Sequence, residues 1–476
     1  MIAFVRKEML EASPPPASQH GWQGWMRENL FSSPLNIALT FVTWIALGAF
    51  TNMAVTWLLH GVWTADSYLE CQEIILAYYG PEASGPCWAV IRERWHQFIF
   101  GFYPVEEWWR PVFCFGLMML AFVAPLFSDD VRNARRVIVP VGVLTLVLMV
   151  LASAPVAACV IGAVIFVGAL AISAKPLRLL PWTGVYPFVA VWLLWGGSLA
   201  GPVMALLGLV ILGMVVRLLS GRLGVPLSAG LGIVAAFVWW TMLEPQIAAS
   251  LPGDLAFLAQ VGSENIGGFL LAFVIGVSAI SMALPLGILL ALGRRSDLFI
   301  VNKLSVGFIE FVRGVPLITL LFTASLLLQY FLPPQVQFET VLRVIILVTF
   351  FSAAYIAEVI RGGLAGLPKG QQEAADALGL DYWQAQRLII LPQALKISIP
   401  GIVNVFIGLF KDTTLVSFVG LMDPLRGVTA IVRADIDWKG AYWEPYLFVA
   451  AIFFVACFGM SRYALYLEAR LKTDHR

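Results

Sequence analysis

The sequence predicts an all-α polytopic membrane protein. Of its 476 residues, 60% are hydrophobic and 12% are charged, whereas a soluble domain carries about a quarter charged residues. The charges also fall between long apolar runs, and about 20 apolar residues in a helix cross the hydrocarbon core of a bilayer. A formal net charge of +1 gives no reason to expect a nucleic-acid partner.

About twelve transmembrane helices follow when the chain is divided at its charges. The expected spans are 37–59, 111–127, 137–153, 156–173, 183–200, 202–219, 225–243, 267–292, 315–331, 341–361, 399–420 and 445–465. Almost no loop separates the spans that meet at Ala154-Pro155 and at Gly201-Pro202. Either pair could instead form one kinked element.

The positions of Lys and Arg predict the orientation, because basic residues concentrate on the cytoplasmic side. Residues 1–36 are charged and proline-containing and lack an apolar signal core, so we expect a cytoplasmic tail. The segment 60–110 carries seven acids against three arginines and is expected outside. Both termini are then cytoplasmic. The segment 421–444 is the exception, because it carries three basic residues on the predicted outer side.

A change in composition near residue 262 predicts two domains. The first, 37–243, is a transmembrane extension with few buried charges and contains the external segment 60–110. The second, 262–470, alternates apolar spans with charged and Pro-Gly segments. Its most unusual part is a polar cytoplasmic segment at about 363–398.

Two short helices are expected within this polar segment. Residues 371–378 favour a helix, and Gly379 follows at a position suited to a positive φ. Asp381 can cap a second helix, with Gln384 three residues later completing a capping box. We expect that second helix to run toward Pro392.

The spacing in this segment resembles the EAA loop of bacterial ABC importer permeases (EAA-x3-G-x9-I-x-L-P). The matching residues are Glu373, Ala374, Ala375, Gly379, Leu391 and Pro392. The sequence around it resembles the polar amino acid (histidine/glutamine) branch. Residues 87–104 resemble the enlarged permease subunit of general L-amino acid importers. The resemblance implies a C-terminal five-helix type I importer core in a multi-pass protein of the bacterial inner membrane.

The resemblance also implies partners. In such importers the EAA helix docks on a cytoplasmic ATPase dimer, which binds ATP and Mg. A second permease subunit, forming a heterodimer, and a periplasmic amino-acid-binding protein complete the assembly, and the cargo is an L-amino acid. The chain has no G-x-x-x-x-G-K-[ST] phosphate-binding loop, so we expect a transport subunit and not an enzyme.

An amino acid bears two charges, so its path through the bilayer must offer polar groups. The candidate pathway residues in the core spans are Lys411, Asp412, Thr413, Asn404 and Tyr355. The alternative is that Lys411 and Asp412 neutralise each other or fix helix packing.

Two acid–base pairs lie three residues apart near the cytoplasmic ends of spans. They are Glu310 with Arg313 and Glu358 with Arg361. At this spacing the side chains are neighbours on a helix, so a gate or interface ion pair is expected.

Cys71 and Cys87 are the two cysteines of the external segment 60–110. An oxidising periplasm would permit a disulfide worth roughly 3 kcal/mol, and two free thiols are the alternative. The four histidines are scattered, so no metal centre is expected.

Two other classes of membrane protein would require different sequence features. An ion-gradient-driven secondary transporter of small polar solutes would place buried acids in inverted repeats. A membrane-embedded enzyme would need a cluster of Asp, His or Arg at the headgroup level. The nearly charge-free region 137–243 does not show such buried acids, and only the isolated Asp129-Asp130 and Arg132 suggest the cluster that an enzyme would need.

Overall fold

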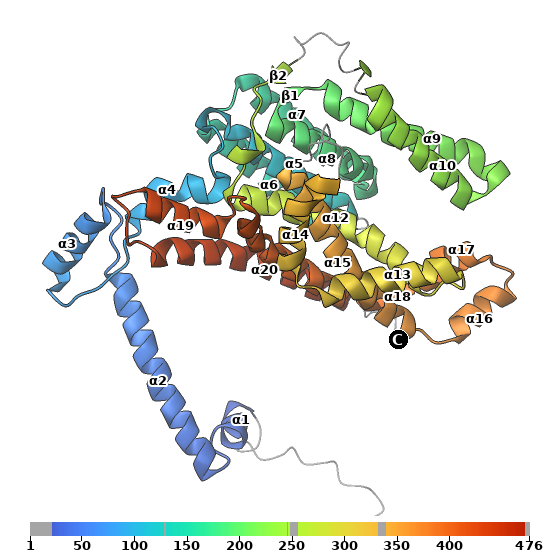
Figure 1. Cartoon of the computed structure of the whole chain (residues 1–476). Coiled ribbons are helices and arrows are strands. Elements are labelled where there is room, and N and C mark those ends of the chain that lie inside the picture. The colour runs from blue at the N-terminus through green and yellow to red at the C-terminus, as the bar shows by residue number, and fades with distance from the viewer. Residues whose placement is uncertain (1–20, 128–129, 245, 248–255, 332–338, 472–476) are drawn as a thin grey trace, which may run out of the picture. The chain divides into compact units, whose positions relative to one another are not determined.

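The computed structural model describes residues 21–127, 130–244, 246–247, 256–331 and 339–471 (Figure 1). This part of the chain is helical, apart from β1 (Gly197–Ser198), which pairs antiparallel with β2 (Ala256–Leu258). The all-α fold class is confirmed. The described residues form two compact units. The smaller unit contains residues up to Arg92 together with 436–444, and the larger unit contains the rest.

The helices of the first half of the chain begin in the smaller unit and continue into the larger one. They are α1 (Gly21–Asn29), α2 (Pro34–Leu59), α3 (Tyr68–Tyr79), α4 (Ala89–Phe100), α5 (Trp109–Leu126), α6 (Val131–Leu151), α7 (Val156–Ile172), α8 (Leu180–Trp195), α9 (Ala200–Leu223) and α10 (Val225–Val238).

The second half of the chain holds the remaining helices. They are α12 (Gly268–Arg294), α13 (Phe299–Gly314), α14 (Leu317–Phe331), α15 (Thr340–Ala365), α16 (Gly370–Ala377), α17 (Tyr382–Ala385), α18 (Leu391–Asp412), α19 (Pro424–Ala434) and α20 (Trp443–Leu471). Short helical turns lie at Val105–Glu107, Pro176–Leu179, Trp239–Leu243, Ser263–Asn265, Gln386–Ile390 and Thr413–Val419.

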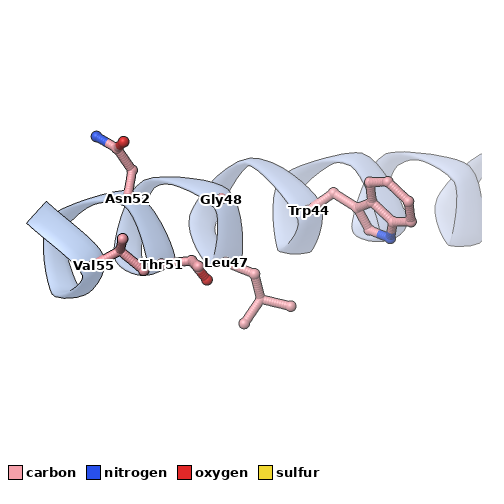
Figure 2. Close-up of a pocket in the computed structure, with 6 residues that line it drawn as sticks. All are labelled: Trp44, Leu47, Gly48, Thr51, Asn52 and Val55. Carbon is pink, nitrogen blue, oxygen red and sulfur yellow. The ribbon is translucent and has the colours of Figure 1, made fainter.

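Helix α2 begins at a clear signal, because the Ser33 hydroxyl accepts a hydrogen bond from the Asn36 amide (3.2 Å) and Pro34 occupies the first turn. The helix has 26 residues and none of them is buried. Six residues of this helix, from Trp44 to Val55, line a pocket (Figure 2). Its lining contains no titratable side chain. This pocket therefore offers no charged group to a ligand.

Close helix packing at glycines builds the core of the larger unit. A Cβ at Gly287 of α12 would lie 2.6 Å from the Ile356 side chain of α15. One turn further along α15, a Cβ at Gly401 of α18 would lie 2.6 Å from the Val359 side chain. The Ser398 hydroxyl also donates to the Val359 carbonyl (3.3 Å). These small residues let the backbones of α12, α15 and α18 approach closely.

The loops that the alternation of spans places outside contact one another. The Gly268 amide donates to the Met422 carbonyl (2.8 Å), and Gly101 pairs with Ile266. The Arg110 side chain donates to the Ala259 carbonyl (2.7 Å). The segment 421–435 therefore lies with the other loops predicted outside, despite its basic residues.

The loops predicted inside also contact one another. The Tyr463 hydroxyl of α20 donates to the Leu126 carbonyl (3.0 Å), and the Tyr466 hydroxyl bonds the Asp130 carboxylate (3.4 Å). Arg135 donates to the Ser173 hydroxyl (3.2 Å). These contacts agree with the predicted alternation. Which end faces the cytoplasm stays a prediction.

The predicted spans correspond one to one with apolar helices of the described chain. Nine helices there are long and apolar enough to cross a membrane, and the bent pair Phe299–Gly314 with Leu317–Leu327 can form a tenth. The remaining two, Val156–Ile172 and Leu227–Leu243, are shorter. The domain boundary near residue 262 stays a prediction.

The helix that was predicted to run toward Pro392 continues past this residue. The helix that begins at Tyr382 does not end near Pro392, because helical structure continues through a π-helical turn, Gln386–Ile390, into α18. The π-helical turn lies directly before Pro392, and a local π adjustment is one way in which a continuous helix accommodates a proline that has no amide donor.

Candidate coupling and transport site

Helix α16 presents the acidic residue of the EAA triplet on its surface. Glu373 and Ala374 are exposed, whereas Ala375 is fully buried. The Gln393 side chain donates to the Gln371 side chain (3.1 Å), which ties α16 to the start of α18. A short helix held in this way can transmit a displacement to the longer helix.

The turn after α16 has the predicted geometry. Gly379 has φ +71°, a conformation that glycine adopts without strain. The Leu380 amide then donates to the Ala375 carbonyl (3.2 Å). Asp381 accepts from the Gln384 amide (2.8 Å), and both halves of the capping box form. The two predicted helix boundaries are confirmed.

The last two residues of the motif lie where the loop enters α18. Leu391 is half-buried and Pro392 is exposed. Leu388, one turn before Pro392, is 64% exposed, and Leu378 at the end of α16 is 75% exposed. Exposed apolar side chains beside an exposed acid are typical of a surface that binds another protein.

A charge network joins three helices at the end of the core that carries α16. Glu358 of α15 contacts Arg361 of α15 (2.6 Å), Arg294 of α12 (3.3 Å) and Arg313 of α13 (3.7 Å). Glu310 of α13 contacts Arg294 (3.0 Å). Three guanidinium groups therefore surround two carboxylates.

Sequence spacing predicted part of this network. The Glu358–Arg361 pair forms. In the described part of the chain Glu310 and Arg313 do not bind each other, because Glu310 binds Arg294 and Arg313 binds Glu358. Arg294 was missed as a member, since it lies 16 residues from Glu310 and 64 from Glu358. The available signal was its position at the basic end of a span.

Tyr355 lies beside this network. The Arg313 guanidinium lies 5.5 Å from the centre of the Tyr355 ring, which also packs on Phe351. Asn404 of α18 is exposed and lies one turn beyond Gly401, which contacts Val359. Tyr355 precedes Val359 by one turn of α15, just as Asn404 follows Gly401 by one turn of α18, and these two helices run in opposite directions. The two predicted pathway residues therefore lie at one level of the α15–α18 pair.

The Lys411-Asp412-Thr413 cluster lies at the far end of α18 from the EAA loop. Lys411 is exposed, Asp412 is half-buried and Thr413 is fully buried. The Thr413 hydroxyl donates to the Phe410 carbonyl (2.7 Å), so its proton is already used. Within the described residues, neither charge of this cluster lies in an ion pair. The charges of Lys411 and Asp412 stay candidates for substrate contact.

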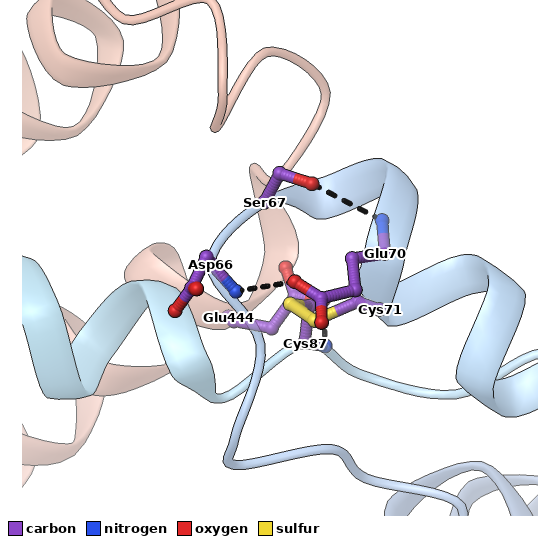
Figure 3. The surroundings of a disulfide bond; sticks show 6 residues. All are labelled: Asp66, Ser67, Glu70, Cys71, Cys87 and Glu444. Atoms are coloured by element: carbon purple, nitrogen blue, oxygen red, sulfur yellow. Dashed lines mark hydrogen bonds between the residues drawn. A yellow bond between two sulfur atoms is a disulfide. The ribbon is translucent and has the colours of Figure 1, made fainter.

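The external segment is closed by a covalent link within the smaller unit (Figure 3). A disulfide joins Cys71 of α3 to Cys87, with their Cα atoms 5.8 Å apart. The buried Glu444 carboxylate accepts from the Cys87 amide (2.7 Å), and Ser67 caps α3 through the Glu70 amide (3.2 Å). The pairing expected from the sequence is thus present, and Glu444 is a buried contact that the sequence did not reveal.

A second buried acid caps α19. Asp423 is fully buried and accepts from the amides of Leu425 and Arg426, both at 3.1 Å. Burial raises the pKa of Asp423 to about 6, although these hydrogen bonds oppose the shift. No group of three metal-binding side chains occurs among the described residues.

Comparison with known proteins decides the family. Residues 283–473 match the family model described as a binding-protein-dependent transport system inner membrane component. The glutamate/glutamine/aspartate/asparagine transport system permease protein BztC of Rhodobacter capsulatus is 57% identical over 475 residues, covering 100% of this chain and 99% of BztC. The chain belongs to the amino-acid ABC transporter permeases. The inner membrane amino-acid ABC transporter permease protein YhdY of Escherichia coli is 34% identical, covering 98% of this chain and 99% of YhdY.

One solved structure, described as an amino acid ABC transporter with histidines, is 29% identical. The match covers 42% of this chain and 91% of the chain in the solved structure, with a TM-score of 0.38.

This amino-acid ABC permease is a multi-pass membrane protein. Because BztC and YhdY align over nearly their whole lengths, the enlarged form with extra N-terminal spans is shared with them. Membership confirms the resemblance read from the EAA spacing and argues against an ion-gradient-driven transporter. The roles of the individual site residues stay predictions.

Proposed function

We propose that the chain is a permease subunit that imports acidic amino acids and their amides, driven by a separate ATPase that docks on α16. The observation that carries the proposal is the exposed Glu373 on a short helix anchored to α18 through Gln371 and Gln393. The name of BztC, which includes glutamate, glutamine, aspartate and asparagine, supports the substrate class.

The anchoring explains how force could enter the membrane. A displacement of α16 is passed through Gln393 to α18, which packs on α15 at Gly401 and Ser398. Because packed helices shift as rigid bodies, this movement can open or close the space beside them. The charge network around Glu358 lies at the same end and would hold α12, α13 and α15 together in one of the two states.

The remaining parts of the assembly belong to the same proposal. They are a second permease subunit, a cytoplasmic ATPase dimer that binds ATP and Mg, and a periplasmic amino-acid-binding protein. The segment 363–398 and both termini then face the cytoplasm of a bacterium. The disulfide Cys71–Cys87 fits an oxidising compartment on the other side.

Docking can be tested by co-purification of the ATPase subunit with this chain from membranes. We expect Glu373→Arg to abolish co-purification, because a reversed charge would stand at the proposed interface. The matched control is Glu82→Arg, an exposed acid of the smaller unit, which should retain the ATPase. Equal retention by both variants would show that α16 is not the docking helix.

A further inference from the structure

Four charged side chains are buried in the described part of the chain, and three of them have a matching partner. They are Arg110, Arg343, Asp423 and Glu444. Arg110 contacts the Glu107 carboxylate (2.7 Å), and the two acids accept backbone amides. Arg343 contacts no carboxylate among the described residues.

Arg343 lies in the first turn of α15, with only 7% of its surface exposed. Its Nη1 donates to the Ser325 carbonyl of α14 (2.6 Å), and its Nη2 donates to the Thr340 hydroxyl (3.3 Å). Its Nε has no hydrogen-bond partner among the described residues, and neither has the buried Ser325 hydroxyl. The Nε of Arg343 and the hydroxyl of Ser325, the residue whose carbonyl Arg343 binds, thus both lack a hydrogen-bond partner among the described residues.

The contrast with other arginines makes this arrangement unusual. Arg94, Arg110 and Arg313 also have an unpaired buried Nε, but each of them contacts a carboxylate. The nearest acid in the sequence to Arg343 is Glu339, which is exposed and bonds the Ser263 hydroxyl. From residue 311 to 357 the sequence contains no other acid. The described part of the chain therefore provides no carboxylate in contact with Arg343.

A guanidinium held in an apolar setting without an anion is costly, and in membrane proteins such groups mark substrate paths. Its fork of donors fits a carboxylate through two parallel hydrogen bonds. We propose that Arg343, together with the Ser325 hydroxyl, binds a carboxylate of the amino acid in transit. This inference rests on the proposed import of acidic amino acids and adds a residue that recognises them.

The two carboxylates of a glutamate can be told apart by comparison with glutamine, which keeps only the α-carboxylate. The experiment uses the complete importer in proteoliposomes, with ATP inside and saturating binding protein outside. Uptake of labelled glutamate and glutamine is measured per assembled complex for wild type, Arg343→Gln and Arg343→Lys. Arg178→Gln, a change of an exposed arginine in the Pro176–Leu179 turn, is the control.

We expect glutamate uptake by Arg343→Gln to fall about tenfold or more, since a hydrogen-bonded charge contact is lost. Arg343→Lys should recover part of the rate because it keeps the cation. A loss confined to glutamate assigns the side-chain carboxylate, and an equal loss for glutamine assigns the α-carboxylate. Wild-type glutamate uptake by Arg343→Gln would overturn the proposal.

Assembly separates a binding role from a structural one. If neither Arg343 variant forms the complex, or if the Lys variant is as inactive as the Gln variant, the side chain serves packing and the proposal is overturned. Failure of the proposed function has a different signature, because wild-type importer would then show no ATP-dependent uptake of either amino acid.

Discussion

Replacing Glu358 by Gln should loosen the contacts among α12, α13 and α15. The carboxylate of Glu358 is the shared partner of Arg294, Arg313 and Arg361, at 3.3, 3.7 and 2.6 Å. A Gln of the same size keeps the shape and one acceptor oxygen but removes the charge. The substitution therefore isolates the electrostatic part of the network.

The magnitude follows from the exposure of the partners. Glu358 has 23% of its side chain exposed, and the three arginines have 24, 32 and 43%. Pairs at this depth are partly screened, so each contributes about 0.5–1 kcal/mol. The loss is then about 1.5–3 kcal/mol, which lowers the melting temperature of a core of this size by about 3–10 °C.

The assay is the thermal melting of the purified permease, compared with Glu310→Gln. Among the described residues Glu310 forms one ion pair, with Arg294, and it is 56% exposed, so the loss of its charge should cost less than about 0.5 kcal/mol. The difference between the two variants should also shrink in 1 M salt, which screens charges over about 3 Å. Equal melting temperatures of the two variants, or no decrease for Glu358→Gln, would refute the reasoning.

Three further predictions follow from buried or strained positions. The pKa of Asp423 is raised to about 6, so the folded protein keeps a proton that the unfolded chain loses near pH 4, and the free energy of unfolding should fall as the pH rises from about 4 through 6. Asp423→Asn should retain the helix cap and remove this pH dependence of the melting temperature. Replacing both Cys71 and Cys87 by Ser should lower the free energy of unfolding by about 3 kcal/mol. A reducing agent should lower the melting temperature of the wild type but not that of the variant. Gly287→Ala should weaken packing by about 1–3 kcal/mol, whereas Gly307→Ala, which faces open space, should leave melting unchanged or raise it.

Local signals gave the best predictions. Gly379 and Asp381 fix the boundaries after α16 because backbone conformation and capping depend on neighbouring residues. Apolar length alone located the spans, since every backbone donor in a bilayer must be paired within its own helix. The continuation of the helix past Pro392 was not predicted, because a proline usually ends or kinks a helix and the π-helical turn that precedes this one leaves no clear sign in the sequence.

Contacts between distant segments could not be predicted in the same way. Arg294 joins the network only because α12 packs beside α13 and α15. Glu444 reaches the Cys87 amide across 357 residues, and Arg343 is buried because α14 covers it. A charged residue in the sequence shows no sign of its partner, so pairing must be read from the packed structure.

In the proposed function, work done by a separate ATPase enters this permease through α16. The most direct measurement is uptake of labelled glutamate into proteoliposomes that contain the complete importer, with and without ATP in the lumen. Accumulation should require ATP and should be lost in the Glu373→Arg importer while the Glu82→Arg importer retains it. Accumulation without nucleotide, or full ATP-driven uptake by Glu373→Arg, would contradict the claim.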